Sequence, residues 1–306
     1  MSTPVHEPSC RRDLDGVVAT AHRLVLRYGD HTAMDTSTFV IPTHAVTAVI
    51  GPNGSGKSTV LNALAGLVEP ASGTLQVLGS DPADVRRRVS YVLQSVTVAA
   101  GTPITVAETV GMGRYPNLGL WRRRSDTDRH RVRTAMERLA ITGLEHKHLT
   151  ELSGGQRQRV YVAQGIAQGH EVLLLDEPLT GLDLVSARTI DDIIHSERDR
   201  GCSVILTTHD LEEARAADHV LLMNGRVVAS GPPEEVLTLA NLESAYGLGA
   251  IHKTVGAFVD DPAHPREPGG PPEGLELQDR SSQRPSGKGR REPGQDADHD
   301  VEHRDR

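Results

Sequence analysis

The chain has 306 residues and a net charge of −8 at neutral pH, which argues against a general nucleic-acid binder, because such a protein needs a basic face. Aromatic residues make up only 3%, so aliphatic side chains must build the core. No apolar run approaches the about 20 residues of a membrane-spanning helix. The two cysteines, Cys10 and Cys202, have no close partner at metal-ligand spacing, so we expect reduced thiols in a cytoplasmic protein.

The first 15 residues are polar, without the apolar segment of a signal peptide, and predict a flexible leader. Residues 16–250 then alternate between strand-like and helix-like segments, the pattern of an α/β domain. The predicted strands lie at residues 17–26, 36–41, 45–50, 75–78 (after a turn at Ser72-Gly73), 89–93, 172–175 and 204–207. A two-residue hairpin is predicted at Asn224-Gly225, between strands at 219–222 and 226–228.

The alternation stops between residues 105 and 168, where three helices in a row are predicted at 105–112, 128–140 and 153–168. We therefore expect a helical subdomain at about residues 100–168, inserted into the sheet domain. Residues 251–306 are rich in proline, glycine and charge, and they predict a disordered tail. The mixture of histidines and carboxylates at 296–303 leaves open a weak metal-binding role for this otherwise solvated acidic segment.

A phosphate-binding loop is predicted at residues 51–58, which read Gly-Pro-Asn-Gly-Ser-Gly-Lys-Ser and fit G-x-x-x-x-G-K-[ST]. A buried strand precedes the loop and a helix predicted from Ser58 to Leu67 follows it, so phosphates would lie at a helix N-terminus. Lys57 places a cation against the β- and γ-phosphates, and Ser58 offers a hydroxyl to Mg²⁺. The predicted nucleotide contacts of this segment are Gly51, Pro52, Asn53, Gly54, Ser55, Gly56, Lys57, Ser58 and Thr59.

Two carboxylates follow the predicted strand at 172–175. Asp176 can hold Mg²⁺, directly or through water. Glu177, which points the other way along an extended chain, is placed to polarise a water molecule for attack on the γ-phosphate.

A second anion site is predicted at Ser153-Gly154-Gly155-Gln156, where Ser153 is a candidate helix N-cap. One chain does not need two phosphate cradles for one nucleotide. We therefore expect the second cradle to serve the nucleotide of another subunit.

The segment Leu152 to Gln156, between the phosphate loop and the Asp-Glu pair, resembles the signature of the ATP-binding cassette (ABC) ATPases. Four further elements match that family in type and order over residues 17–250. Tyr28 resembles the aromatic residue that stacks on adenine, and Gln94 resembles the glutamine that senses Mg²⁺ and the membrane partner. Asp183, in Gly181-Leu182-Asp183, matches the loop that crosses the dimer interface, and His209 matches the histidine that contacts the γ-phosphate.

The resemblance implies a P-loop NTPase fold, with a mostly parallel central sheet, an antiparallel β subdomain and the inserted helical subdomain. It implies ATP and Mg²⁺ as cofactors, Lys57, Glu177 and His209 as catalytic residues, and Ser58, Gln94 and Asp176 as metal ligands. The implied partners are a second ATPase subunit, an integral membrane permease and, through the permease, an extracytoplasmic solute-binding protein. No nucleic acid is implied, and the location is the cytoplasmic face of the cell membrane.

Residues 111–124 resemble the corresponding segment of zinc and manganese importers, and also that of iron-siderophore and cobalamin importers. We expect them to dock the permease; the alternative is a basic loop on a solvated face. The resemblance favours an importer of a divalent metal cation, zinc or manganese, over one for a chelate. An exporter subunit, a DNA-repair or ribosome-acting ABC protein and a GTPase stay open as alternatives. The last three fit less well, because the chain has no long coiled coil, no second cassette and no Asn-Lys-x-Asp segment.

Overall fold

The computed structural model of the protein describes residues 16–94, 103–118 and 125–247. The leader at 1–15 and the tail at 251–306 predicted from the sequence lie outside the described residues. None of the described helices has the length and apolar character needed to cross a membrane.

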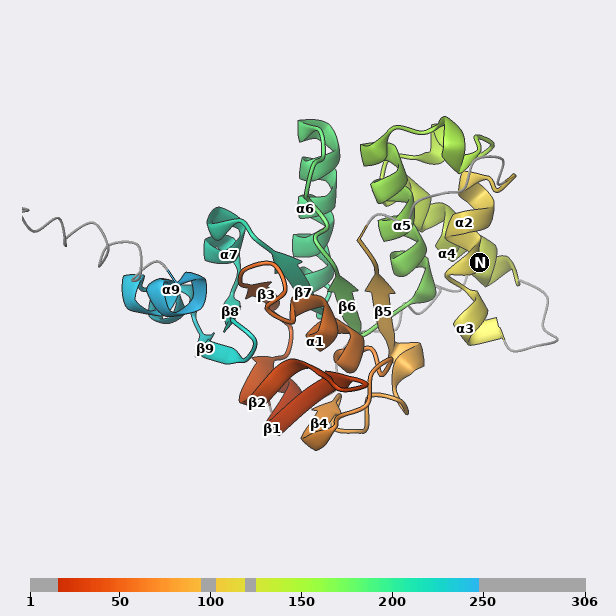
Figure 1. Ribbon diagram of the computed structural model, residues 1–306. Helices are drawn as coiled ribbons and strands as arrows, with labels where there is room; N and C mark the ends of the chain where they lie inside the picture. The colour runs from red at the N-terminus through yellow and green to blue at the C-terminus, as the bar shows by residue number, and fades with distance from the viewer. Residues whose placement is uncertain (1–15, 95–102, 119–124, 248–306) are drawn as a thin grey trace, which may run out of the picture. The chain divides into compact units, whose positions relative to one another are not determined.

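Two β-sheets organise the described residues (Figure 1). The smaller sheet is antiparallel, with strand order β2-β1-β4, and the larger has order β5-β6-β7-β3-β8-β9. All neighbours in the larger sheet are parallel except β8 and β9. The strands are β1 (Val17–Tyr28), β2 (His31–Pro42), β3 (Val46–Ile50), β4 (Ser72–Val77), β5 (Val89–Val92), β6 (Val172–Leu175), β7 (Ser203–Thr208), β8 (His219–Met223) and β9 (Val227–Gly231). This confirms the predicted antiparallel β subdomain and mostly parallel central sheet.

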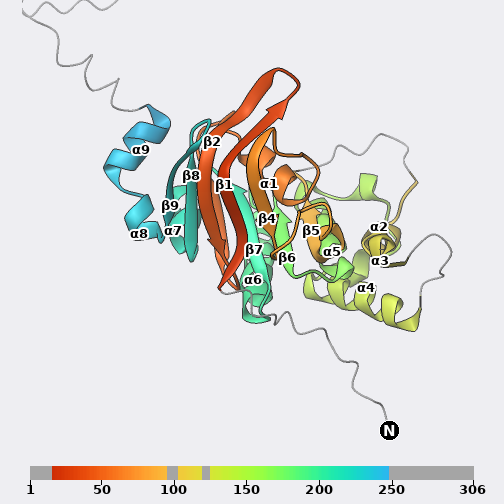
Figure 2. The same cartoon turned by 90° about the horizontal axis from the view of Figure 1, so that it is seen from below.

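The helices cover both faces of the central sheet (Figure 2). They are α1 (Lys57–Leu64), α2 (Val106–Met112), α3 (Tyr115–Leu118), α4 (Asp126–Arg138), α5 (Gly154–Gln168), α6 (Leu184–Asp199), α7 (Leu211–Ala216), α8 (Pro233–Val236) and α9 (Leu239–Tyr246), with short 3-10 turns at 86–88, 142–144 and 149–151. Helix α1 lies between the two sheets, and α5 packs against the edge strand β5, with α2 to α4 beyond it (Figure 1).

Two hydrophobic cores lie on opposite faces of the central sheet. Strand β3 shows why, because side chains alternate across a strand. Val46 and Ile50 enter the core shared with the helical subdomain, α6 and α7, whereas Val49 enters the core shared with α1 and the antiparallel sheet. Both faces of β3 are therefore buried, which fixes the loop that follows Ile50 in position.

The helical subdomain contains the three helices predicted from the sequence, α2, α4 and α5, together with the short α3. A capping box begins each of the three helices: a Ser or Thr accepts from the third helical N–H, and that residue's side chain accepts in return. The pairs are Thr105 with Glu108, Ser125 with Asp128, and Ser153 with Gln156. The second helix therefore begins at Asp126, two residues before the predicted start. Residues 100–102 and 119–124 of the predicted subdomain lie outside the described residues.

Four local predictions are wrong. Ser72 and Gly73 belong to β4 and not to a turn, and β4 ends at Val77. Helix α1 ends at Leu64 and not at Leu67, because Gly66 has a φ of 70° and breaks the helix. The hairpin between β8 and β9 has three connecting residues rather than two, since Met223 pairs with Val227. The fourth concerns Glu177 and is described with the site.

A buried ion pair anchors α4 within the helical subdomain. Arg114 Nε donates to Asp128 Oδ1 at 2.9 Å, and both side chains are 8% exposed. Asp128 also accepts hydrogen bonds from the backbone and hydroxyl of Ser125. Burial alone would raise the pKa of Asp128, but the hydrogen bonds of Ser125 and Arg114 lower it to about 2.

We expect Asp128→Asn to destabilise the protein by about 3 kcal/mol at pH 7, because the change leaves Arg114 buried without its counter-charge. The folded-state pKa is below the unfolded value of about 3.9, so the unfolded state binds more protons between these two values. The difference between wild type and variant should therefore be complete above about pH 5 and shrink as the pH falls toward about 2. Denaturant unfolding across this range measures it.

Asp126→Asn is the matched control, since Asp126 starts the same helix but its side chain is 96% exposed beside Arg129. Its effect should stay within about 0.5 kcal/mol at every pH. A difference for Asp128→Asn that is as large at pH 3 as at pH 7 would contradict the assigned ionisation.

Candidate nucleotide-binding site

The phosphate loop joins β3 to α1 and packs tightly against the chain. A Cβ atom on Gly51 would lie 2.1 Å from the Met223 carbonyl oxygen, and one on Gly56 would lie 2.6 Å from that of Ala33. Gly56 also has a φ of 97°, a conformation that side chains disfavour. These two glycines are therefore required both by the loop conformation and by the close approach of neighbouring backbone.

Lys57 is buried at the first position of α1. Its Nζ donates to the carbonyl oxygens of Gly51 at 2.9 Å and Pro52 at 3.2 Å, so the loop wraps around the ammonium group. Burial lowers the pKa of Lys57, and the negative charges of Glu177 and Asp176 oppose this shift. The lysine predicted to face the phosphates is thus held at the centre of the loop, close to both carboxylates.

Asp176 is the buried acceptor at the centre of the site. Its Oδ1 accepts from the hydroxyl groups of Ser58 at 3.2 Å and Thr207 at 2.5 Å, and its Oδ2 accepts from Tyr91 at 3.4 Å. Burial and the adjacent Asp176 raise the pKa of Tyr91, so this hydroxyl stays a donor. The structure therefore brings together Ser58 and Asp176, two of the three predicted metal ligands.

The spacing of these two oxygens fits Mg²⁺. Octahedral ligands at about 2.1 Å from Mg²⁺ place neighbouring oxygens about 3 Å apart. The Ser58 hydroxyl and the Asp176 carboxylate already have this separation. Gln94, the third predicted ligand, lies nearby but donates through Nε2 to Glu177 Oε2 at 2.7 Å.

Glu177 does not continue the strand as an extended residue, contrary to the prediction. Strand β6 ends at Leu175, and Glu177 has a φ of 46°, in the left-handed region. Its N–H donates to Thr207 Oγ1 at 2.8 Å, which holds the backbone in this turn at a cost of order 1–3 kcal/mol. Glu177 lines the pocket described below, and Glu177 and Asp176 both lie close enough to Lys57 to act on its charge.

A pocket of about 530 Å³ lies between the phosphate loop and Glu177. Its lining residues are Gly51, Pro52, Asn53, Gln94, Glu177, His209 and Tyr246. His209 follows β7, and its side chain is exposed at this pocket; its contact with the γ-phosphate stays a prediction. Tyr28 is 48% exposed at the end of β1, and its hydroxyl accepts from Asn62 Nδ2 at 3.1 Å, which places its ring near the outer side of α1.

The predicted signature residues are not part of this pocket. Ser153 caps α5, and its side chain accepts from the Gln156 N–H at 3.2 Å. A Cβ on Gly155 would lie 2.4 Å from Asp183 Oδ2, so Asp183, the N-cap of α6, packs directly against the signature. Asp183 therefore contacts the predicted second anion site at residues 153–156. Within one chain, that site is separate from the pocket at the phosphate loop.

Comparison with known proteins agrees with this geometry. The family model for ABC transporters matches residues 34–180. The manganese transport system ATP-binding protein MntB of Listeria monocytogenes is 35% identical over 225 residues, covering 73% of this chain and 94% of that protein. This chain belongs to the ABC transporter ATPases.

Two further proteins similar to this chain are described as components of metal transporters. The chelated iron transport system membrane protein YfeB of Yersinia pestis is 36% identical over 236 residues, 76% of this chain and 80% of that protein. A solved structure described as a metal-chelate type ABC transporter in an inward-facing conformation has a TM-score of 0.66 and 27% identity, covering 75% of this chain and 88% of that one. The ATPase activity and the predicted fold class are confirmed by this family membership.

Three residues of the site were not found from the sequence, and only the third of them lines the pocket. Thr207 and Tyr91 hydrogen-bond to Asp176, and Tyr246 lines the pocket from α9. Among the described residues, the buried hydroxyl of Tyr246 has no hydrogen-bond partner. Thr207 could have been found if β6 and β7 had been recognised as parallel neighbours, since Leu175 pairs with Leu206.

Proposed function

We propose that this ABC ATPase energises the import of a divalent metal cation, manganese or zinc, through an integral membrane permease. The observation that carries the proposal is the similarity to manganese transport ATP-binding proteins over nearly their whole length. The ATPase would act at the cytoplasmic face of the membrane, and an extracytoplasmic solute-binding protein would deliver the metal to the permease.

Hydrolysis would take place between two copies of the chain. Each copy offers a phosphate loop in one place and an exposed signature cradle in another, and neither alone encloses a triphosphate. In a two-fold dimer, the signature N-terminus of α5 of one copy would complete the phosphate site of the other. Asp183, packed on Gly155, would lie at this contact.

The residues of the site would each carry out a different part of ATP hydrolysis. Lys57 and the loop N–H groups would hold the phosphates, and Ser58 with Asp176 would hold Mg²⁺, which neutralises charge on the phosphate oxygens. Glu177, fixed by Gln94 and Thr207, would orient a water molecule and accept its proton. His209, which also lines the pocket, would donate to the γ-phosphate as charge develops.

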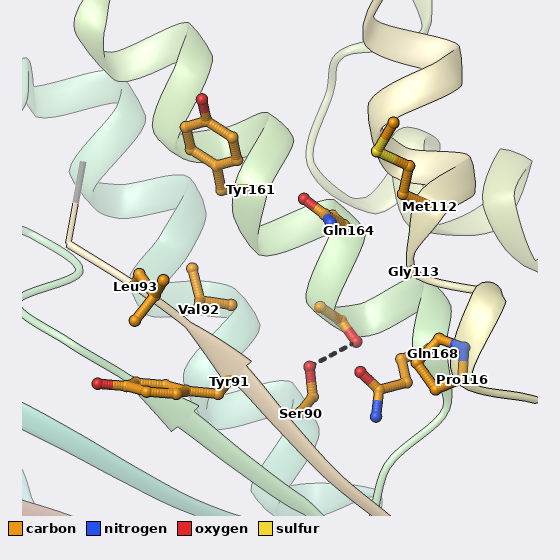
Figure 3. Close-up of a pocket in the computed structure, with 11 residues that line it drawn as sticks. Ser90, Tyr91, Val92, Leu93, Met112, Gly113, Pro116, Tyr161, Gln164 and Gln168 are labelled. Carbon is orange, nitrogen blue, oxygen red and sulfur yellow. Dashed lines mark hydrogen bonds between the residues drawn. The ribbon is translucent and has the colours of Figure 1, made fainter. Parts of the chain in front are cut away.

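The permease would dock in a groove of about 250 Å³ between the sheet and the helical subdomain (Figure 3). Leu93 follows β5 on one wall, and Met112 and Pro116 line the other. Strand β5 and α5 are held together at the floor of the groove, where Ser90 Oγ donates to the Gly165 carbonyl at 3.0 Å, the bond drawn in Figure 3.

The groove offers apolar surface to a partner next to Gln94, because the side chain of Leu93 is 49% exposed and that of Met112 is 38% exposed. The groove includes residues from the first part of the segment predicted to dock the permease, residues 111–124. Residues 119–124 of that segment lie outside the described residues.

We expect Met112→Asp to reduce co-purification with the permease at least about tenfold, because a charge would be buried without a partner in the docked groove. Nucleotide binding by the isolated ATPase should stay close to that of the wild type. Leu239→Asp is the matched control, since Leu239 is 72% exposed on α9, outside the groove. Equal retention of the permease by both variants would contradict the docking surface.

Metal uptake tests the transport proposal. Cells lacking the protein should lose high-affinity uptake of Mn²⁺ or Zn²⁺, and wild-type protein should restore it whereas Lys57→Ala should not. If uptake of both cations is unaffected, a divalent-metal importer is excluded. Loss of iron-chelate uptake instead would support the second candidate, which the similarity to the chelated iron transport protein favours.

A further inference from the structure

Three potential metal ligands converge at the edge of the central sheet opposite the nucleotide pocket. His170 precedes β6, Cys202 precedes β7, and Glu197 lies in the last turn of α6. Val172 pairs with Ser203 in the parallel β6–β7 ladder, so the residues just before each strand are neighbours. Asp176 and His209 follow the other ends of the same two strands, and the cluster is therefore distinct from the ATP site.

The donor atoms already have nearly the spacing that a metal ion requires. The three ligand atoms lie within 4.8 Å of one another, and His170 Nε2 is 3.0 Å from Glu197 Oε2. A tetrahedral Zn²⁺ site with bonds of about 2.0–2.3 Å separates its ligand atoms by about 3.3–3.8 Å. A bound ion would therefore have to draw the farthest pair of ligand atoms together by up to about 1 Å. Among the described residues, this is the one cluster of three or more such side chains with this spacing.

The cluster is also buried, and a residue outside it holds one of its ligands. The side chains of His170 and Glu197 are 2% and 4% exposed, and Cys202 is 4% exposed. Arg138 of α4 binds Glu197 Oε1 at 2.5 Å, which leaves Oε2 directed toward His170. An outer partner that fixes one carboxylate oxygen while the other faces the ligands is a common arrangement around metal sites.

The chemistry of the donors selects the ion. One thiolate, one imidazole and one carboxylate suit Zn²⁺, whereas Mg²⁺ and Mn²⁺ prefer oxygen ligands. We propose that His170, Glu197 and Cys202 form a Zn²⁺-binding site that ties the C-terminal end of α6 to the starts of β6 and β7. Binding releases the Cys202 thiol proton to solvent and requires Nε2 of His170 to be unprotonated. Water fills the fourth position. The site does not depend on the transport function proposed above.

Cobalt substitution tests the site through its thiolate. The full-length reduced chain is titrated with Co²⁺, and then with Zn²⁺ in competition. We expect one equivalent of Co²⁺ to give the near-ultraviolet charge-transfer absorption of a cobalt–thiolate bond, which Zn²⁺ then removes. Cys202→Ser should lose this absorption, and Cys10→Ser, which alters the other cysteine of the chain, should keep it. Absence of the band in the wild type, or its presence in Cys202→Ser, overturns the proposal.

Thermal unfolding is a second measurement, and it distinguishes metal binding at this site from metal binding at other histidines. Zn²⁺ at about one hundred times its dissociation constant should stabilise the wild type by about 2.7 kcal/mol, because it binds the folded state. His170→Gln and Cys202→Ser should fold without metal and lose this stabilisation, and His146→Gln, whose side chain is 92% exposed, should retain it. Equal stabilisation of all four proteins would show that the three residues form only a buried ion pair beside a thiol.

Discussion

Replacing Glu177 by Gln is expected to lower ATP turnover by about 10²–10⁴-fold while leaving ATP binding intact. The amide has the shape of the carboxylate and can keep the contact with Gln94, but it cannot accept a proton from water. The backbone turn at Glu177 depends on its N–H bond to Thr207, which the substitution does not touch. Phosphate release measures turnover, and direct nucleotide titration measures binding.

The same variant should accumulate as an ATP-bound dimer, because hydrolysis is the step that lets the two copies separate. Size-exclusion chromatography with ATP and Mg²⁺, in the presence of the cognate permease where needed, detects this species. Glu212→Gln is the matched control: Glu212 lies in the first turn of α7, its side chain is 79% exposed, and it pairs with Arg215 at 2.6 Å. Turnover of Glu177→Gln within about tenfold of the control, with monomers only, would remove Glu177 as the general base.

The features predicted correctly from the sequence are those that one short segment encodes. The phosphate loop, the carboxylates after an apolar strand and the capped start of α5 each need only a local pattern of residue types. Ser153 illustrates this, since its capping bond to Gln156 spans three residues. Such patterns could be located before any strand was paired with another.

The features that were missed depend on the order of strands in the sheet. Thr207 meets Asp176, and Cys202 approaches His170, because β6 and β7 are adjacent and parallel in one register. In the sequence these pairs are separated by about thirty residues, and Cys202 had no ligand partner at a recognisable spacing. The conformation of Glu177 was likewise predicted wrongly, since its left-handed turn is imposed by Thr207 from the neighbouring strand.

Two variants that are each inactive alone are expected to recover ATP turnover when they are co-expressed, if each ATP site is built from two chains. Lys57→Ala removes the cation of the phosphate loop. Gly154→Asp places a negative charge at the signature, and the fold accepts it because a Cβ on Gly154 meets nothing within 4 Å and an acid in the first helical turn is favourable. Each homodimer carries two damaged sites, and both should lack turnover.

A mixed dimer of these variants has one site with both changes and one site with neither. Random pairing of equal amounts makes half of the dimers mixed, so co-expression should recover about one quarter of the wild-type ATP turnover if the two sites act independently. Lys57→Ala co-expressed with Glu177→Gln is the matched control, because both changes lie on the phosphate-loop side and every site in the mixed dimer stays damaged. Recovery in the first mixture and none in the second can arise only when Lys57 of one copy works with the signature of the other. If the first mixture gains no activity over its parents, the two cradles do not share a nucleotide.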